Sequence, residues 1–266
     1  MIEEPTEAQR EGAIAYENLW VPALFGQWAK IVTEEAQPGS TQQVLDVACG
    51  TGVLAQEVAS RLNHPGQVTG VDSNPGMLSV AMEHNKNINW VQGPAEDLPF
   101  PDNSFDVVLC QFGLMFFADR VKAIQEMNRV ISPQGRLVIT VWDALENIPA
   151  YSRSVSLIEK FAGSKAREAL NAPFELGDKA VLQSTFRDAG VTDIEISTHT
   201  GTARFPDIKS MIEADVRGWL PVLGIVLEEN EIQEIFNQAS DLLSEYISSD
   251  GKVTFDITAH VITHQS

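Results

Sequence analysis

The sequence predicts an α/β protein with a doubly wound, mostly parallel seven-stranded sheet, helices on both faces and a helical cap. Seven short apolar runs have the composition of strands, and amphipathic segments of helical periodicity lie between most of them. Such alternation is typical of a parallel sheet covered on both faces. A glycine-rich turn follows the first strand, as in folds that bind ligands at the carboxyl edge of the sheet.

The elements follow one another in a regular order up to residue 142 and less regularly beyond it. The expected strands are 43–48, 67–72, 88–92, 106–111, 136–142, 193–199 and 252–263. The expected helices are 12–35, 53–62, 77–85, 119–131, 154–161, 179–189 and 231–247. Pro22 bends the first helix or begins a second one. We expect a single domain, 1–266, with a core of about 36–143, 177–204 and 251–266 and a cap of 1–35, 144–176 and 205–250.

Composition and charge narrow the classes of function. A chain with 44% hydrophobic and 21% charged residues is globular, and it contains no apolar run long enough to span a bilayer. The start lacks the pattern of a secretory signal, and Cys49 and Cys110 lie in apolar strand contexts typical of reduced thiols, so we expect a cytoplasmic protein. The net charge of −19 leaves no basic face for nucleic acid or an anionic membrane. The oligomeric state stays open.

The most informative segment is the strand, turn and helix around Gly50. The strand 43–48 runs directly into Gly50-Thr51-Gly52 and then into a helix. Glycine permits a tight turn and a close approach to a ligand, while the helix amino end supplies free N–H groups and a positive dipole. Asp72 ends the next strand about 20 residues later, where a carboxylate can accept both hydroxyls of a ribose. These positions predict an adenosine-containing cofactor at the carboxyl edge of the sheet.

Spacing alone leaves the cofactor open, because Gly50, Gly52 and Ala55 also fit the dinucleotide pattern G-x-G-x-x-G/A. Three strings in order are more specific: LDVACGTG, GVDSNPGML and GPAEDLPFPDNSFDVVLC. Together, over about residues 40–142, they resemble class I S-adenosylmethionine-dependent methyltransferases of the ubiquinone/menaquinone-methylase-like branch. The resemblance implies a Rossmann-like fold, S-adenosyl-L-methionine as cofactor and methyl transfer to a small-molecule acceptor.

The resemblance also implies a set of cofactor-binding residues. Asp46, the backbone of Gly50 and Gly52, and Gln111 would hold the methionine end, and Asp72 the ribose. Ser73 and Met77 would flank the adenine or the ribose, Glu96 and the backbone of Ala95 would line the adenine edge, and Ala48 is a further cofactor-binding residue. Relatives often carry Asp where this chain has Pro94, which has no side-chain acceptor for the adenine amino group. Glu96 or a backbone carbonyl must then accept in its place.

Methyl transfer from a sulfonium is an in-line displacement that mainly requires alignment and exclusion of water. A general base can assist it, and the candidates for a catalytic role are His199, Tyr151 and Asp143. Asp143 follows the fifth strand and His199 ends the sixth, at the edge where substrates of this fold bind. His84 and His64 are less favoured.

The remaining histidines do not indicate a catalytic or a metal site. His260 and His264 alternate with apolar residues on the last strand, so we expect them to face solvent. No group of His, Cys, Asp and Glu has metal-ligand spacing, so no metal is expected.

Aromatic residues in separate segments suggest an acceptor site. The residues expected around one cleft are Trp20, Phe25, Met115, Phe116 and Trp219. Packing against the core is a simpler interpretation for the aromatics near the amino terminus, and packing against the next helix explains Met115 and Phe116 equally well. A cleft of this kind favours a small, apolar or aromatic acceptor, and acidic surroundings tolerate an amine better than a carboxylate.

Two alternatives stay open at the level of the sequence. A regulator that binds S-adenosylmethionine or S-adenosylhomocysteine without catalysis has the same motifs. A nicotinamide-dependent oxidoreductase shares the glycine turn, although this chain has no Tyr-x-x-x-Lys pair and no second nucleotide half.

Overall fold

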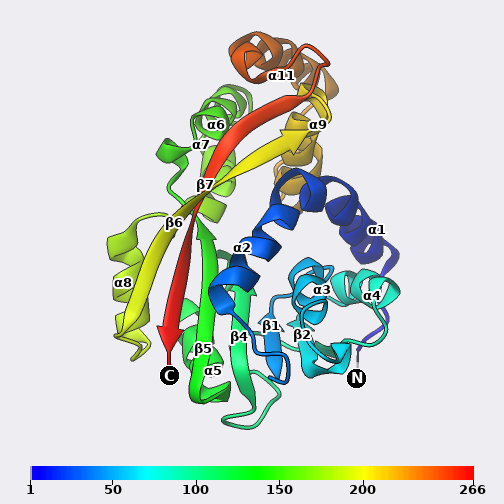
Figure 1. Cartoon of the computed structure of the whole chain (residues 1–266). Helices are drawn as coiled ribbons and strands as arrows, with labels where there is room; N and C mark the ends of the chain where they lie inside the picture. The colour runs from blue at the N-terminus through cyan, green and yellow to red at the C-terminus, as the bar shows by residue number, and fades with distance from the viewer. Residues whose placement is uncertain (1) are drawn as a thin grey trace.

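The computed structural model describes residues 2–266, and its centre is the predicted seven-stranded sheet (Figure 1). The strands are β1 (Val44–Val47), β2 (Val68–Asp72), β3 (Asn89–Gln92), β4 (Phe105–Gln111), β5 (Ile131–Trp142), β6 (Ile194–Phe205) and β7 (Val253–Gln265). They lie in the order β3-β2-β1-β4-β5-β7-β6. β1 to β5 are parallel, and β7 runs antiparallel to both of its neighbours. The doubly wound, mostly parallel sheet is confirmed. Met1, in the first expected cap segment, lies outside the described residues.

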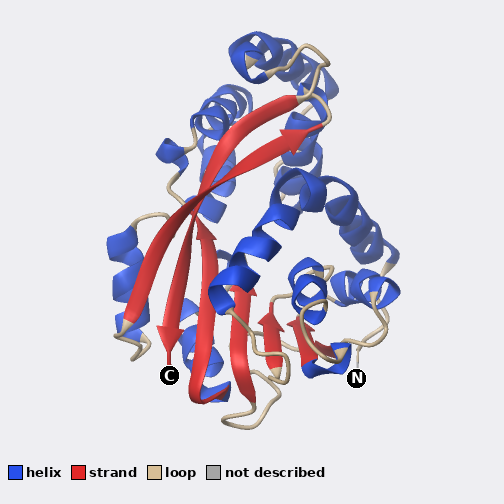
Figure 2. Cartoon of the chain, in the orientation of Figure 1, coloured by secondary structure: helices blue, strands red, loops and turns tan. Residues whose placement is uncertain are grey.

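Helices cover both faces of the sheet and gather above one end of it (Figure 2). They are α1 (Glu7–Ala15), α2 (Gly26–Ala36), α3 (Val53–Ala59), α4 (Pro75–His84), α5 (Arg120–Val130), α6 (Pro149–Ala162), α7 (Ser164–Asn171), α8 (Lys179–Asp188), α9 (Ile208–Glu213), α10 (Leu220–Val222) and α11 (Glu229–Leu242). Several begin where the sequence offers a capping residue: Asp119 accepts from the N–H of Lys122 at α5, and Asp178 accepts from that of Ala180 at α8. α7, α9 and α10 were not predicted.

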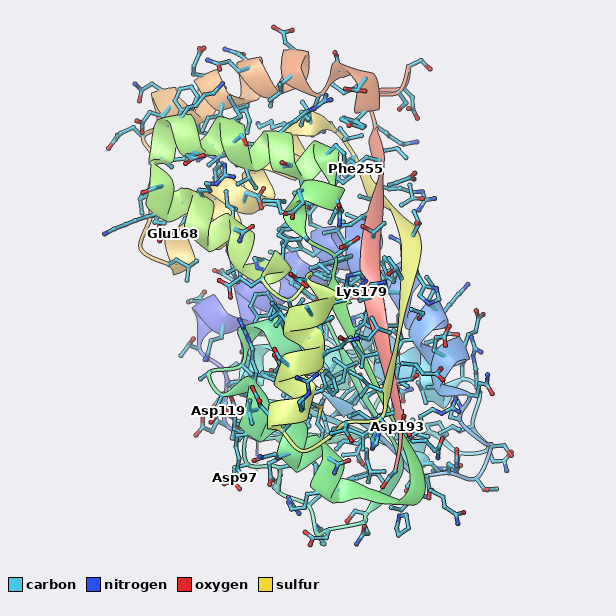
Figure 3. The ribbon with its side chains drawn as sticks, turned by 90° about the vertical axis from the view of Figure 1, so that its left-hand side faces the viewer. Asp97, Asp119, Glu168, Lys179, Asp193 and Phe255 are labelled. Carbon is cyan, nitrogen blue, oxygen red and sulfur yellow. The ribbon has the colours of Figure 1, made fainter. Side chains whose placement is uncertain are left out.

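Two apolar clusters hold the layers together. One joins α2 and α3 to the sheet through buried residues such as Val32, Leu54 and Val107. The other lies between the sheet, α5 and α8 and continues into the helices above the sheet. Figure 3 shows this second face, with α8 starting at Lys179 below α6 and α7, and with Phe255 higher on β7 beside them. The helices above the sheet therefore share a continuous core with it.

Two π-helices interrupt the helical segments. The first, η1 (Tyr16–Phe25), joins α1 to α2 and contains Pro22, which has no N–H to give to a regular helix. At the end of η1 the N–H of Gly26 donates a hydrogen bond to the carbonyl of Val21, five residues earlier, which is the spacing of a π-helix. The second, η6 (Ala214–Trp219), follows α9, and at its end the N–H of Leu220 donates to the carbonyl of Asp215, again five residues earlier. The segment 12–35 is helical as predicted, but its helix begins earlier, at Glu7.

The strands β6 and β7 extend beyond the rest of the sheet. The pairing of β5 with β7 ends at Trp142 and Ala259, whereas the pairing of β6 with β7 continues to Phe205 and Val253. This two-stranded ribbon rises above the carboxyl ends of the parallel strands and carries α9, η6, α10 and α11 at its tip (Figure 1). Those elements reach the space above the sheet because the ribbon is long.

The strand lengths correct two sequence predictions. His199 does not end β6: it lies in the middle of this strand, partly exposed, with its Nε2 2.9 Å from the Ser197 hydroxyl and 3.4 Å from a Glu35 carboxylate oxygen. His260 does not face solvent either, since only 2% of its surface is exposed. β7 is an inner strand, and the ring of His260 contacts the Gly177 carbonyl and the Thr198 hydroxyl instead. Among the described residues, no helix is long and apolar enough to cross a bilayer.

Candidate active site

The glycine turn lies where β1 ends and α3 begins. Gly50 and Gly52 have φ of +55° and +89°, in the left-handed region that glycine adopts without strain. A Cβ on Gly52 would lie 2.5 Å from the Trp90 ring, so no larger residue fits there. Ala48 also has a positive φ of 56°, which is uncommon for a residue with a side chain. The local sequence thus forces a tight turn with the amino end of α3 beside it.

Two carboxylates flank this turn. Asp72, at the end of β2, accepts hydrogen bonds from the N–H of Gly50 at 2.9 Å and from that of Asn74 at 2.8 Å. Asp46 on β1 is 1% exposed, and one of its carboxylate oxygens has no hydrogen-bond partner. Burial raises the pKa of Asp46 to about 8, the charge of Asp72 adds to the shift, and a hydrogen bond from the Ala55 N–H opposes it. Burial also raises the pKa of Asp72, against the hydrogen bonds that it accepts. Among the described residues, no Lys, Arg or His charge contributes to the pKa of either carboxylate.

A cavity beside Asp72, which we call the edge cavity, contains several of the residues predicted from the sequence. Its lining consists of Ala48, Asp72, Ser73, Gly93, Pro94, Ala95, Glu96, Phe116, Phe117 and Ala118. Glu96 is partly engaged, because one of its carboxylate oxygens accepts from the N–H of Ala118 at 3.0 Å. Pro94 is exposed at the rim, so an acceptor for an amino group here must come from Glu96 or from the backbone.

Met77 and Gln111 do not line the edge cavity. Met77 is half-buried on α4. Gln111 ends β4, and its amide donates to the carbonyl of Phe25 at 3.3 Å, while its own carbonyl oxygen is buried without a partner. Gln111 therefore joins the sheet edge to the end of η1.

The candidate bases are placed very differently from one another. Asp143 accepts from Asn147 at 2.9 Å, from Thr258 at 2.9 Å and from the N–H of Ala144 at 2.8 Å. Burial opposes its charge, but these hydrogen bonds together lower its pKa. Asp143 thus ties the end of β5 to β7 and lines neither the edge cavity nor the aromatic cavity described next. His199, on the outer strand β6, also lines neither cavity, and its ring contacts Glu35 instead.

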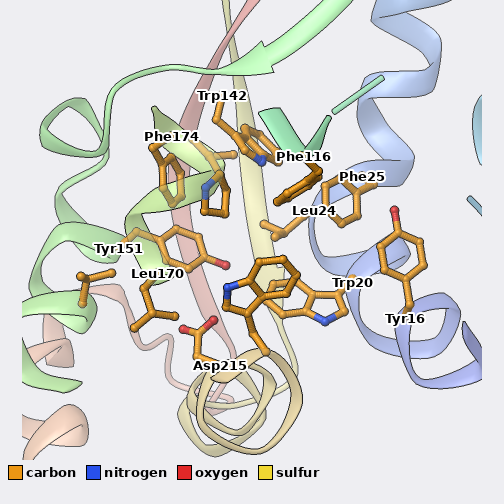
Figure 4. Close-up of a pocket in the computed structure, with 14 residues that line it drawn as sticks. Tyr16, Trp20, Leu24, Phe25, Phe116, Trp142, Tyr151, Leu170, Phe174 and Asp215 are labelled. Atoms are coloured by element: carbon orange, nitrogen blue, oxygen red, sulfur yellow. The ribbon is translucent and has the colours of Figure 1, made fainter. Parts of the chain in front are cut away.

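A second cavity, the aromatic cavity, lies under the helices above the sheet (Figure 4). Eight aromatic side chains line it: Tyr16, Trp20, Phe25, Phe116, Trp142, Tyr151, Phe174 and Trp219. The rest of the lining is Leu24, Val155, Leu170, Pro173, Ile257 and Asp215. Trp20, Phe25, Phe116 and Trp219 are therefore gathered around one cavity as predicted, whereas Met115 is buried in the core.

The aromatic side chains hold one another in place. Phe25 lies 5.3 Å from Tyr16 and 5.9 Å from Trp142, measured between ring centroids. Phe116 lies 5.5 Å from Trp219, whose indole N–H donates to the carbonyl of Ala169 at 2.9 Å. Ring contacts of this kind stabilise a defined cavity shape. The cavity is thus preformed.

Phe116 connects the two cavities, and Tyr16 connects the aromatic cavity to the glycine turn. Phe116 is 51% exposed and lines both of them. Tyr16 lines the aromatic cavity, and its ring lies about 4 Å from the position that a Cβ on Gly50 would occupy. Burial raises the pKa of Tyr16, as do the charges of Asp72 and Asp46, so its hydroxyl stays protonated. A ligand at the glycine turn and a ligand in the aromatic cavity would meet beside these two rings.

Known proteins with the same organisation identify the family. Residues 45–139 match the family described as "Methyltransferase domain". A demethylmenaquinone methyltransferase of Staphylococcus carnosus is 34% identical over 188 residues, which cover 65% of this chain and 78% of that protein. A demethylmenaquinone methyltransferase of Staphylococcus epidermidis is 35% identical over 190 residues, with the same coverage. The solved structure of the YcgJ protein from Bacillus subtilis covers 90% of this chain and 98% of its own with a TM-score of 0.61, at 22% identity.

The chain belongs to the class I S-adenosylmethionine-dependent methyltransferases, in the quinone-methylase-like branch. This methyltransferase uses S-adenosyl-L-methionine as its cofactor and transfers the methyl group to a small-molecule acceptor. The non-catalytic regulator and the nicotinamide-dependent oxidoreductase are not favoured.

The glycine turn of the methyltransferase fits this cofactor. The buried, unpartnered oxygen of Asp46 suits the ammonium of the methionine end, and Asp72 can still accept from ribose hydroxyls, because each carboxylate oxygen has two lone pairs. The Thr51 hydroxyl, 1% exposed and also without a partner, is a third polar group at the turn. A positively charged ligand would stabilise the ionised form of these two carboxylates, whose pKa values are raised by burial.

The sequence did not predict several residues of the aromatic cavity, among them Tyr16 and Asp215. The available signal for Asp215 was an acid, with Glu213 two residues before it, in the largely apolar stretch Met211 to Val226, but the stretch has no regular period. Tyr16 and Asp215 both belong to π-helices, which the usual helical spacing does not reveal.

Proposed function

We propose that the methyl acceptor is a small, apolar or aromatic molecule bound in the aromatic cavity. The observation that carries this proposal is the position of that cavity: it adjoins the glycine turn at Tyr16 and shares Phe116 with the edge cavity. Cavities lined by aromatic side chains with few polar groups favour ligands with an apolar body. The relatives named demethylmenaquinone methyltransferases make a quinone-like ring one member of the proposed class.

The cofactor-binding part of the proposal follows the geometry of the sheet edge. Asp46 and the backbone at Gly50 and Gly52 hold the methionine end, Asp72 holds the ribose, and the edge cavity takes the adenine between Ser73, Ala95 and Glu96. Ala48 lines the same cavity. Gln111 acts indirectly, by holding the end of η1 through the Phe25 carbonyl. Met77 is not part of this proposal, because it does not line the cavity.

When bound, S-adenosylmethionine supplies a methyl group that is already activated on a sulfonium. The protein therefore has to orient the acceptor and exclude water. The rings of Tyr16, Phe25 and Phe116 do both at the junction of the cavities. Tyr151 lines the aromatic cavity, but burial and the charge of Asp215 raise its pKa well above the usual value, so it can donate a hydrogen bond but is not a base near neutral pH.

The cap is the third part of the proposal. We assign acceptor selection to the segments 1–35, 144–176 and 205–250, because every residue of the aromatic cavity except Phe116, Trp142 and Ile257 comes from them. The core of about 36–143, 177–204 and 251–266 carries the cofactor. We place the reaction in the cytoplasm, in keeping with two buried, free cysteines.

The proposal is tested by following labelled methyl groups from S-adenosylmethionine into a panel of acceptors. The panel holds naphthoquinols, phenols and arylamines, together with RNA and a protein mixture. We expect turnover among the ring compounds and competition between them. Exclusive labelling of RNA, of protein or of an anionic sugar would overturn the acceptor class, while binding of S-adenosylhomocysteine by calorimetry would still report on the cofactor site.

A further inference from the structure

Asp215 is the only carboxylate among the residues that line the aromatic cavity. It lies on η6, is 5% exposed, and one of its carboxylate oxygens is buried without a hydrogen-bond partner. In residues 2–266 no Lys, Arg or His forms an ion pair with it. Burial alone raises its pKa to about 7. A buried carboxylate without a partner is costly, so its presence in an apolar cavity calls for a ligand that compensates it.

Asp215 lies apart from the carboxylates of the cofactor site. The charges of Asp46 and Asp72 act on Tyr16, whereas the charge of Asp215 acts on Tyr151. Figure 4 shows Asp215 and Tyr151 on one side of the aromatic cavity and Tyr16 on another. The cavity therefore has a cofactor end, at Tyr16, and a cap end, at Asp215.

The surroundings of Asp215 suit a cation. Trp219 lies one turn further along the same π-helix, and Trp20 and Tyr151 line the cavity from other elements. The faces of aromatic rings attract cations, most strongly when water is excluded. An ammonium here would meet a carboxylate and several rings, and no basic residue among the lining residues would repel it.

We infer that the acceptor carries a protonated amine, which binds Asp215 at the cap end while the atom to be methylated lies at the cofactor end. This rests on the proposed function, because it assumes that the aromatic cavity is the acceptor site. Asp215 is thus a specificity-determining residue: its carboxylate pairs with the ammonium, and the rings of Trp20, Tyr151 and Trp219 enclose the adjoining carbon atoms. The acceptor is an aromatic or alkyl amine whose nucleophile is a second group, separated from the nitrogen by the length of the cavity.

Matched ligands test this inference on the complete protein. Tyramine, 4-ethylphenol and 3-(4-hydroxyphenyl)propionate share a ring and a two-carbon chain but differ in the charge at its end. With S-adenosylhomocysteine at saturation, calorimetry should show that tyramine binds at least about tenfold more tightly than 4-ethylphenol, because only tyramine gains the ion pair and the ring contacts. The carboxylate should not bind.

Two variants assign the preference to its residue. Asp215→Asn keeps the shape of the side chain and removes its charge, so tyramine should lose about tenfold in affinity while 4-ethylphenol stays within about threefold. Glu213→Gln is the control, since it removes a charge two residues away that pairs with Lys209 and Arg217 outside the cavity. It should leave the affinity of both ligands unchanged.

The possible outcomes are distinct. Equal binding of tyramine and 4-ethylphenol to the unaltered protein would overturn the inference and leave the proposed function standing. An equal loss of affinity for tyramine and 4-ethylphenol in Asp215→Asn would also overturn the inference and leave the proposed function standing, because it would make Asp215 a structural residue. If S-adenosylhomocysteine binds and neither the three ring compounds nor a naphthoquinol does, both the inference and the proposed acceptor class are wrong.

Discussion

The edge cavity and the aromatic cavity share Phe116, yet they are built in different ways. The edge cavity is formed by the ends of neighbouring parallel strands and the loops after them, so that Asp72, Ser73 and Gly93 to Glu96 come from a short stretch of chain. The aromatic cavity takes residues from elements that include η1, β5, α6, α7, η6 and β7, and its lining runs from Tyr16 to Ile257.

The charges in the two places differ as well. Burial and the nearby charge of Asp72 together raise the pKa of Asp46. Both carboxylates flank the amino end of α3. Asp215 stands alone among aromatic rings. We propose from this difference that the sheet edge recognises the cofactor partly through the backbone, whereas the cap recognises the acceptor through side chains. Segments carried on a rigid scaffold commonly hold such recognition residues.

The largest expected effect comes from a deletion that removes part of the lining of the aromatic cavity and none of the lining of the edge cavity. Phe205 and Val253 are paired partners at the tip of the β6–β7 ribbon, so a short Asn-Gly hairpin can replace residues 206–252. Acceptor turnover should fall by on the order of 1,000-fold or more, because the aromatic cavity loses Asp215 and Trp219 and its roof. The affinity for S-adenosylhomocysteine, measured by calorimetry, should change by less than about threefold.

This deletion also uncovers the apolar faces of α6 and α7 that pack against α11 and α10, so a point variant accompanies it. Trp20→Leu removes one wall of the aromatic cavity and leaves the ribbon intact. It should raise the KM for the acceptor by roughly tenfold, the size of an aromatic contact, and leave cofactor binding alone. A deletion variant that kept its acceptor preference would show that the cap does not select the acceptor.

The second prediction concerns the sheet edge. Asp72→Ala should weaken S-adenosylhomocysteine binding by roughly 1–3 kcal/mol, or about 5–150-fold, since hydrogen bonds to a charged group are lost. The acceptor's KM at saturating cofactor should stay within about twofold if the cavities are independent. Calorimetry and steady-state kinetics measure the two quantities. The variant also loses the contact to the Gly50 N–H, so its unfolding temperature without ligand is the control. Extensive unfolding of the Asp72→Ala variant without ligand would show that Asp72 is a structural residue.

The smallest expected effect is on stability and depends on pH. The pKa of Asp215 is raised to about 7 in the folded protein, from an ordinary value of 3.8. Between about pH 4 and about pH 7 the folded protein therefore holds more protons than the unfolded chain. The free energy of unfolding falls as the pH rises through this range, and the loss is constant above about pH 7. Asp215→Asn removes this loss. Its melting temperature should exceed that of the unaltered protein by on the order of 5 °C at pH 8, with little difference near pH 4.

Glu213→Gln is again the comparison, because Glu213 is partly exposed and paired. A melting temperature of Asp215→Asn that falls at pH 8 would show that the carboxylate is satisfied within the protein and needs no ligand. A rise that is accompanied by lost binding of amines would show that the charge is kept for recognition, at a cost in stability.

The sequence by itself determined the sheet, its glycine turn and the carboxylates beside it. Gly50 and Gly52 adopt left-handed conformations that depend on the residue type, and Asp72 ends the strand next to β1, so local rules suffice. The helices that begin at Asp119 and Asp178 were predictable for the same reason, because caps act over a few residues. Motifs in a short stretch of chain also carried the family and the cofactor.

Only the tertiary structure decided which residues line the aromatic cavity and which histidines are buried. Alternation along β7 suggested that His260 faces solvent, but an inner strand has both faces covered, so the neighbours and not the pattern set its burial. His199 lies outside the site because β6 continues past it, a length fixed by pairing with β7. Asp215 and Tyr16 reach the cavity through π-helices and a long ribbon. Burial and the pKa of a carboxylate depend on what distant segments pack around it, and no local rule contains that information.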